Sequence, residues 1–287
     1  MATLKAIRRR VASIRNIQQI TKAMKMVAAA RLRKAQEAVF AARPYAEKFE
    51  AVLQHLASQG QEAAHPLLEV REEKNIDLVV VTSDRGLCGG FNSNLIRTAE
   101  AFIREHSEQK VTLAIVGRRG YDYFRRRTIP IGEHHTDLPG RLTLSLAHDV
   151  GVRMSQRFLN KESDGIYVVY ARFRSAVVQT PTIDRVLPIV AKEQNATQTT
   201  TKDYLYEPQP YELLDSLLSR YIEMLIYRAA LESVASEHGA RMTAMDNATN
   251  NAVDMISRLT LDMNRARQSG ITRELLEIVS TSEALKD

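Results

Sequence analysis

The chain has 287 residues, of which 44% are hydrophobic and 26% charged, the proportions of an ordinary soluble globular protein. Its single cysteine excludes a framework of internal disulfide bonds. No apolar run approaches the ~20 residues that a membrane-spanning helix needs. The formal net charge is only +6, so the position of the charges is more informative than their sum.

Positive charge is concentrated at the N-terminus, where no acidic side chain precedes Glu37. An arginine-rich start without acidic residues is typical of a mitochondrial transit peptide. However, apolar residues recur every three or four positions from Leu4 to Val27, which favours a permanent amphipathic helix. The periodicity continues beyond Pro44, so we predict a kinked helix over residues 1–58. Its cations before Glu37 are Lys5, Arg8, Arg9, Arg10, Arg15, Lys22, Lys25, Arg31, Arg33 and Lys34.

The middle of the chain alternates apolar runs with helical patterns, which predicts a Rossmann-like α/β domain over residues 76–200. The expected strands are Ile76–Ser83, Val111–Gly117 and Gly165–Phe173, and the expected helices are Asn92–His106 and Ser145–Leu159. Residues 177–189 contain Pro181 and Pro188, so they are expected to form an edge strand and a connection. The polar residues 194–202 are expected to form a loop.

A second long helix is predicted over residues 211–287, a segment without proline. One of its faces carries mostly small or flexible side chains in steps of three and four: Met242, Met245, Thr249, Ala252, Ile256, Leu259, Met263 and Ala266. This spacing is typical of a coiled coil. If the two long helices lie antiparallel, the longer one should extend past the other by roughly 30 Å, from about Asn264 onward. That extension is rich in apolar residues and would need a surrounding partner in water.

Residues 83–92 read SDRGLCGGFN, a glycine-rich stretch between a predicted strand and a predicted helix. This layout is typical of a phosphate-binding loop, but the Lys-Ser/Thr pair of a P-loop and the G-x-G-x-x-G spacing are both missing. We therefore predict a structural turn formed by Gly86, Cys88, Gly89 and Gly90, with Asn92 or Ser93 capping the helix. A phosphate site and a catalytic cysteine remain as alternatives.

No cofactor, metal or catalytic residue is predicted from the sequence. The adjacent His134 and His135 are a weak signal for a metal, because no spaced third ligand accompanies them.

Three segments together resemble the gamma subunit of F-type ATP synthases in its bacterial form. They are ITKAMKMVAAARLRKAQ (20–36), SDRGLCGGFNSNL (83–95) and MTAMDNATNNAVDMISRLTLDMNRARQSGITRELLEIV (242–279). The resemblance implies an α/β fold with an antiparallel coiled coil of the terminal helices. It also implies a non-catalytic rotor shaft, which couples rotation of a membrane c-ring to the cycling of catalytic sites on the beta subunits.

The resemblance also implies partners and contact residues. The partners are three alpha and three beta subunits, the epsilon subunit and the c-ring, at the cytoplasmic face of the bacterial membrane. The residues that match the family's contact motifs are Arg10, Ser13, Met24, Lys25, Arg241, Arg267, Gln268, Thr272 and Glu274. The coupling ion, a proton or a sodium ion, is a property of the membrane subunits.

Two other classes of function are compatible with parts of the sequence. A small-molecule enzyme built on the α/β domain would leave both long helices without a purpose. A nucleic-acid-binding coiled coil would use the basic N-terminus, but a basic leucine zipper keeps its DNA-contacting region free of a continuous apolar seam. Here the same residues, Leu4 to Val27, are both basic and apolar in pattern.

Overall fold

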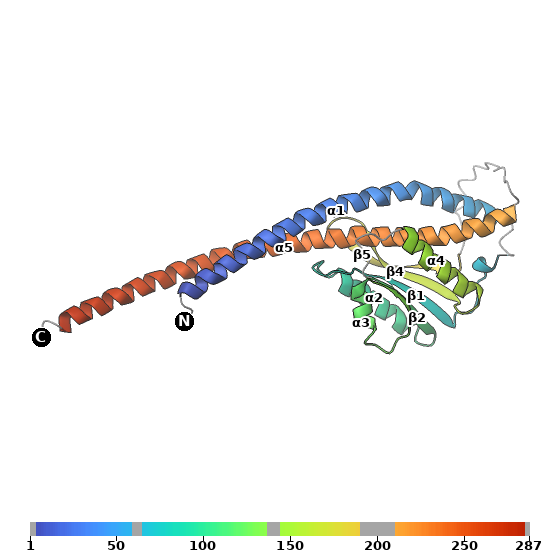
Figure 1. The fold of residues 1–287 in the computed structure, drawn as a ribbon. Helices are drawn as coiled ribbons and strands as arrows, with labels where there is room; N and C mark the ends of the chain where they lie inside the picture. The colour runs from blue at the N-terminus through green and yellow to red at the C-terminus, as the bar shows by residue number, and fades with distance from the viewer. Residues whose placement is uncertain (1–3, 59–64, 137–143, 190–209, 285–287) are drawn as a thin grey trace. The chain divides into compact units, whose positions relative to one another are not determined.

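The computed structural model describes residues 4–58, 65–136, 144–189 and 210–284 (Figure 1). The chain forms two compact units. The paired-helix unit consists of Met1–Ala28 and Met242–Asp287, and the sheet unit consists of Ala29–Arg241.

Two long helices begin and end the described chain, as the sequence predicts. Helix α1 (Leu4–Ser58, 55 residues) continues through Pro44, and α5 (Pro210–Ala284) has 75 residues. The residues that follow the predicted N-terminal helix, 59–64, and the predicted polar loop at 194–202 lie outside the described residues. The last three residues of the predicted C-terminal helix also lie outside them.

In the paired-helix unit, α1 and α5 lie side by side and antiparallel (Figure 1). Thr21 Oγ1 lies 2.8 Å from Thr249 Oγ1, and Lys25 Nζ lies 2.6 Å from Asp246 Oδ1. The antiparallel direction follows because the later residue of α1 contacts the earlier residue of α5. This register puts Leu4 level with about Ala266, and α5 continues for about 18 residues, or roughly 27 Å, beyond that level.

The face of α1 that packs in this unit agrees with the expected apolar face at Val11, which is 7% exposed, and departs from it further along the helix. Thr21 and Ala28 are buried, whereas Ile17, Ile20 and Val27 are 49%, 59% and 53% exposed. The apolar surface of the helix is wider than contact with one neighbouring helix can cover. Thr21 and Ala28 take the contact in this part of α1 because small side chains allow the two backbones to approach closely, and Ile17, Ile20 and Val27 are left outside.

The sheet unit is built on five strands in the order β3-β2-β1-β4-β5. Strands β1 to β4 are parallel, and β5 is antiparallel to β4 at the edge. The strands are β1 (Asn75–Val81), β2 (Lys110–Val116), β3 (Ile131–His135), β4 (Gly165–Phe173) and β5 (Gln179–Leu187). The predicted edge position of the proline-containing strand is confirmed.

Helices cover both faces of the sheet, as in a doubly wound α/β fold. Helices α2 (Phe91–Glu105) and α3 (Arg118–Phe124) pack with Leu78, Val80 and the other residues of one face. On the opposite face, α4 (Leu144–Leu159) packs with the start of α5, with Phe49 of α1 and with the short 3₁₀ helix η2 (Pro66–Leu68).

Three elements of the sheet unit were missing from the sequence prediction, namely η2, which has only 3 residues, β3 and α3. Strand β3 reads IGEHH and has one aliphatic residue, and α3 has only 7 residues. None of the three is long enough to show a hydrophobic period. The other predicted strands and helices of the domain agree with the structure within two residues at each end.

The register of the helix pair can be tested by cross-linking in a Cys88→Ala background. Cysteines introduced by Leu4→Cys and Ala266→Cys are expected to form a disulfide or to react with a short bifunctional reagent, because the two positions lie level. The pair Leu4→Cys and Thr249→Cys is the control, since these positions are separated by roughly 25 Å along the helix axis. Efficient cross-linking of the control pair, with none of the first pair, would contradict the register.

Candidate functional site

The glycine-rich stretch forms a tight turn between β1 and α2. Gly89 has φ 57°, and Leu87 has φ 62° although it carries a side chain. Glycine adopts this left-handed region without steric cost, so Gly89 suits its position. Gly86 and Gly90 do not have positive φ angles, so the backbone conformation at these two positions does not require glycine.

Cys88 lies inside this turn and is 2% exposed. Burial raises the pKa of the thiol above its ordinary value, while the positive charge of Arg241 opposes the shift. A thiol with a raised pKa is protonated at neutral pH and is a poor nucleophile. The geometry therefore gives no support to the catalytic-cysteine alternative.

The prediction that Asn92 or Ser93 caps α2 is wrong. The N-cap residue is Gly90, and no side chain caps the helix. The Oδ1 atom of Asn92 instead accepts a hydrogen bond of 3.0 Å from the backbone N–H of Ser83. The side-chain amide of Asn92 donates to Ser83 Oγ at 2.8 Å, so Asn92 ties the two ends of the turn together.

The turn is bonded to the next turn of the sheet, which follows β2. The backbone N–H of Arg118 donates to Asp84 Oδ1 at 2.8 Å, and that of Arg119 donates to Ser83 O at 3.1 Å. Gly117 has φ 100°, and a Cβ atom at this position would collide with Thr82 O. Gly117 is therefore a glycine that this edge of the sheet requires, and the sequence analysis missed it.

Arg241 of α5 reaches this turn from the other side. Its Nη2 atom donates to Gly86 O at 3.1 Å and lies 2.7 Å from Glu237 Oε1, while its Nη1 atom donates to His238 Nδ1 at 3.2 Å. Arg241 is 9% exposed. Its predicted role as a partner contact is untested, and within the sheet unit its guanidinium group already has these three internal partners.

The electrostatics of this cluster follow from burial. Burial, assisted by the charges of Arg241 and Arg31, lowers the pKa of His238 from 6.5 to about 4. His238 is therefore neutral at physiological pH and can accept the hydrogen bond from Arg241. Burial raises the pKa of Glu237, and the neighbouring Arg241 opposes that shift. Neither Glu237 nor His238 was singled out from the sequence.

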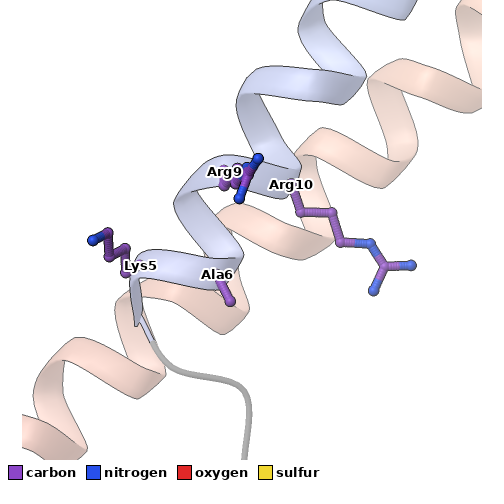
Figure 2. A pocket seen from close by; sticks show the side chains of 4 residues that line it. All are labelled: Lys5, Ala6, Arg9 and Arg10. Atoms are coloured by element: carbon purple, nitrogen blue, oxygen red, sulfur yellow. The ribbon is translucent and has the colours of Figure 1, made fainter.

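Near the N-terminus, α1 presents an unusually basic surface in the paired-helix unit. Lys5, Ala6, Arg9 and Arg10 line an open depression of about 470 Å³, and Figure 2 shows the three cationic side chains pointing away from one another. Arg10 and Ser13, both predicted partner contacts, are exposed. Exposed cations at this end of α1 would attract an acidic partner surface.

Met24 and Lys25 are half-buried. Lys25 forms the ion pair with Asp246 described above, and its side chain is 41% exposed. Exposed and half-exposed pairs of this kind contribute only about 0–1 kcal/mol to stability. A partner carboxylate could therefore compete with Asp246 for Lys25 at little cost.

The four remaining predicted contacts lie on α5 and are all exposed: Arg267, Gln268, Thr272 and Glu274. Thr272 Oγ1 donates to Gln268 O at 3.0 Å, one turn earlier in the helix. The four residues fall at and beyond the level where α1 begins. They share this part of α5 with apolar side chains that are 51–65% exposed, namely Ile271, Leu275, Leu276, Ile278 and Val279.

The two adjacent histidines lie on β3, where the ring of His134 stacks on Tyr121 with centroids 4.1 Å apart. Within the described residues, no group of three or more His, Cys, Asp or Glu side chains is placed to hold a metal ion. None of the helices in the described ranges is long and apolar enough to span a membrane.

The lowered pKa of His238 predicts an acid-dependent loss of stability. Between pH 6.5 and about 4, the unfolded chain binds a proton at this residue and the folded chain does not. The free energy of unfolding should thus fall by up to about 3 kcal/mol through this residue as the pH drops across that window. The raised pKa of Glu237 changes the free energy of unfolding in the opposite direction over acidic pH. The effect of His238 must therefore be measured as the difference between the wild type and a variant without this histidine.

Denaturant unfolding of the wild type and of His238→Gln over this pH range measures that difference. Glutamine can still accept the hydrogen bond from Arg241 but does not titrate, so the variant should lose less stability on acidification. Parallel pH profiles of the two proteins would show that His238 is not the source.

Comparisons with known proteins agree with this architecture. The ATP synthase family profile matches residues 3–285. The ATP synthase gamma chain of Geobacter metallireducens is 47% identical over 288 residues, and that of Pelotomaculum thermopropionicum is 46% identical over 286 residues. In both cases the match covers 100% of this chain and 100% of the relative.

Solved structures show the same fold at much lower identity. One chain of the Euglena gracilis mitochondrial ATP synthase, in a structure with OSCP, F1 and the c-ring, superposes with a TM-score of 0.70 at 20% identity. That match covers 98% of this chain and 94% of the other. A chain from the central stalk and c-ring of the Tetrahymena thermophila enzyme gives a TM-score of 0.63 at 23% identity, covering 80% of this chain and 99% of the other. Because the family profile and the full-length relatives cover almost every residue, this chain belongs to the family of ATP synthase gamma chains.

Proposed function

We propose that the chain is the central rotor shaft of a bacterial F-type ATP synthase and has no catalytic site of its own. The shaft turns with the c-ring and drives the three beta catalytic sites through their states in succession. Its partners are the alpha and beta subunits, the epsilon subunit and the c-ring, at the cytoplasmic face of the membrane. The bacterial origin of its full-length relatives supports this location.

The observation that carries the proposal is the single-helix end of α5. Beyond the level of Leu4, its large apolar side chains are more than half exposed. A helix with this much apolar surface is a liability in water unless a partner surrounds it. Apolar contacts have no preferred direction, so an apolar sleeve in the ring of alpha and beta subunits can hold the helix and still let it turn.

Polar residues at the start of that end suit contacts that form and break during rotation. We assign this role to Arg267, Gln268, Thr272 and Glu274, with Arg10 and Ser13 on α1. Arginine offers five N–H donors in a rigid fork, and glutamine can donate and accept. Met24, Lys25 and Arg241 belong to the same proposal, but a partner would have to compete with the internal contacts of Lys25 and Arg241.

Reconstitution tests the proposed function directly. Complexes assembled with this chain are expected to contain the alpha, beta, epsilon and c subunits and to pump ions into vesicles when ATP is hydrolysed. Complexes assembled without it should not pump. Ion pumping at the same rate in the absence of the chain would refute the shaft role.

The isolated chain is expected not to bind ATP. The turn at residues 83–90 has no lysine to pair with phosphates, and the guanidinium group of Arg241, which reaches this turn, is already bonded to Gly86 O, Glu237 and His238. Isothermal calorimetry with Mg-ATP measures this, with the assembled complex as the positive control. Saturable binding in the low micromolar range by the chain alone would contradict the non-catalytic assignment.

Substitutions on α5 should separate the polar contacts from general effects on the helix. Gln268→Leu removes one neutral hydrogen bond, worth about 0.5–1.5 kcal/mol, and should lower the ATPase rate of the assembled complex by about two- to tenfold. Arg267→Leu should lower it further, because charge-assisted hydrogen bonds are roughly twice as strong. Leucine is a good helix former, so helicity should not change.

The matched control is Arg273→Leu, which removes an exposed cation of the same helix outside the proposed contact set. Its steady-state ATPase rate should stay near that of the wild type. All rates are compared between complexes with verified full subunit content. Wild-type rates for both Arg267→Leu and Gln268→Leu would exclude these two contacts.

A further inference from the structure

The sheet order reverses at the boundary between β1 and β4. Helices α2 and α3 lead from β1 toward β3 on one face, and α4 leads into β4 on the other face. In open α/β sheets, ligands bind in the crevice outside the carboxyl ends of the strands at such a point. In this chain, that crevice is bordered by the turn 83–90 after β1 and the turn 174–178 after β4.

Helix α5 crosses this crevice. Its residues Ile222, Ile226 and Ala229 are buried with α4 on one face of the sheet, whereas Ala240 is buried with α2 and α3 on the other. Between these two positions α5 therefore passes over the edge of the sheet. It does so at the carboxyl ends of β1 and β4, because Ser236 contacts Ala171 of β4 and Arg241 contacts Gly86 in the turn after β1.

Two small residues bring α5 close to the end of β4. Ser236 Oγ donates to Ala171 O at 2.9 Å. Ala171 pairs with Pro181 of β5, which has no N–H to offer, so the serine hydroxyl supplies a donor there. At Gly239, a Cβ atom would lie 3.2 Å from Ala176 O in the next turn, which is tighter than an ordinary contact.

Arg241 closes the other side of the crevice. Its hydrogen bond to Gly86 O holds the turn after β1, and Glu237 and His238 orient the same guanidinium group. The turn after β1 is in turn bonded to the turn after β2 through Asp84 and Ser83. A displacement of α5 at Arg241 would therefore be passed on to the ends of the two central strands.

We propose that residues 236–241 of α5 fill the ligand crevice of the α/β domain as an internal ligand. Arg241 is the positioning residue of this contact, which we call the helix socket. The socket occupies the place where a nucleotide would bind in an open α/β sheet, and it joins the sheet to residues 236–241 of α5. Its use for carrying torque from the sheet to the shaft rests on the proposed function, whereas its existence does not.

The first test measures the socket without reference to rotation. Arg241→Leu removes the hydrogen bond to Gly86 O, so the turns next to the socket should open locally at a lower cost in free energy. Hydrogen–deuterium exchange of the assembled complex should then be about tenfold faster in peptides covering residues 83–90 and 174–178. Peptides covering β3 should exchange at the wild-type rate. Unchanged exchange in both turns would overturn the socket.

The second test measures coupling, as ions pumped per ATP hydrolysed in reconstituted vesicles. Arg241→Leu should lower this ratio severalfold, whereas Arg241→Lys, which keeps one donor and the charge, should restore part of it. Gly239→Val should lower it as well, since the added side chain wedges α5 away from Ala176 and leaves Arg241 intact. A wild-type ratio in fully assembled Arg241→Leu and Gly239→Val complexes would overturn the mechanical role.

Arg220→Leu is the matched control. It removes an exposed cation of the same helix, in the sheet unit but outside residues 236–241. The exchange rates and the ratio of ions pumped to ATP hydrolysed should both stay near wild type. A defect as large as that of Arg241→Leu would show that loss of the socket contact does not explain the effect of Arg241→Leu. If Arg241→Leu fails to assemble, the exchange and the pumping measurements are made on Arg241→Lys and Gly239→Val instead, and wild-type values in both variants would overturn the proposal. Failure of the wild-type complex to pump would refute the proposed function, and exchange would still decide the socket.

Discussion

The close approach of α1 and α5 is the constraint on which the paired-helix unit depends. Ala28 and Ala252 are 1% and 5% exposed, and no bulky side chain at those positions holds the backbones apart. Thr21 Oγ1 and Thr249 Oγ1 lie 2.8 Å apart between the helices, and each hydroxyl also lies within hydrogen-bond distance of a carbonyl of its own helix, Gln18 O and Met245 O. These two short side chains therefore meet across the contact without either hydroxyl depending on the other. The same constraint turns Ile17, Ile20 and Val27 outward and makes them available to a partner.

The sequence predicted the long elements well and the short ones badly, for a physical reason. A helix of 55 or 75 residues repeats its pattern many times, and β1, β2 and β4 are nearly continuous apolar runs. Strand β3 and helix α3 are too short to repeat any pattern. The predicted packing face of α1 was also wrong from Ile17 onward, because hydrophobicity ranks Ile20 above Thr21, whereas close helix contact selects the smaller side chain.

The glycine-rich turn illustrates how far a motif can be interpreted from sequence alone. The argument against a phosphate site could be made from the sequence, because the turn has no lysine in the required position. The residues that hold the turn in place could not be identified from the sequence. Arg241 and Ser236 lie about 150 positions later in the chain, and Gly117 is required only because Thr82 O lies where its Cβ atom would be. Such requirements arise from contacts between distant segments, which composition and periodicity do not record.

Helix α5 passes through three environments along its length, and its side chains differ accordingly. Small residues, Ser236 and Gly239, lie where it crosses the sheet edge; Met245 and Ala252 are buried where it pairs with α1; and Leu275 and Leu276 are exposed where it runs alone. The backbone hydrogen bonds continue through all three parts without a proline. A continuous helix can transmit a torque only if it is held firmly where the torque is applied. In this chain, residues 236–241 are held by directional hydrogen bonds, from Arg241 to Gly86 O and from Ser236 to Ala171 O. The residues past Ala266 instead carry exposed apolar side chains. The different behaviour of the two parts of α5 follows from the different chemistry of hydrogen bonds, which have a preferred direction, and of apolar contacts, which do not.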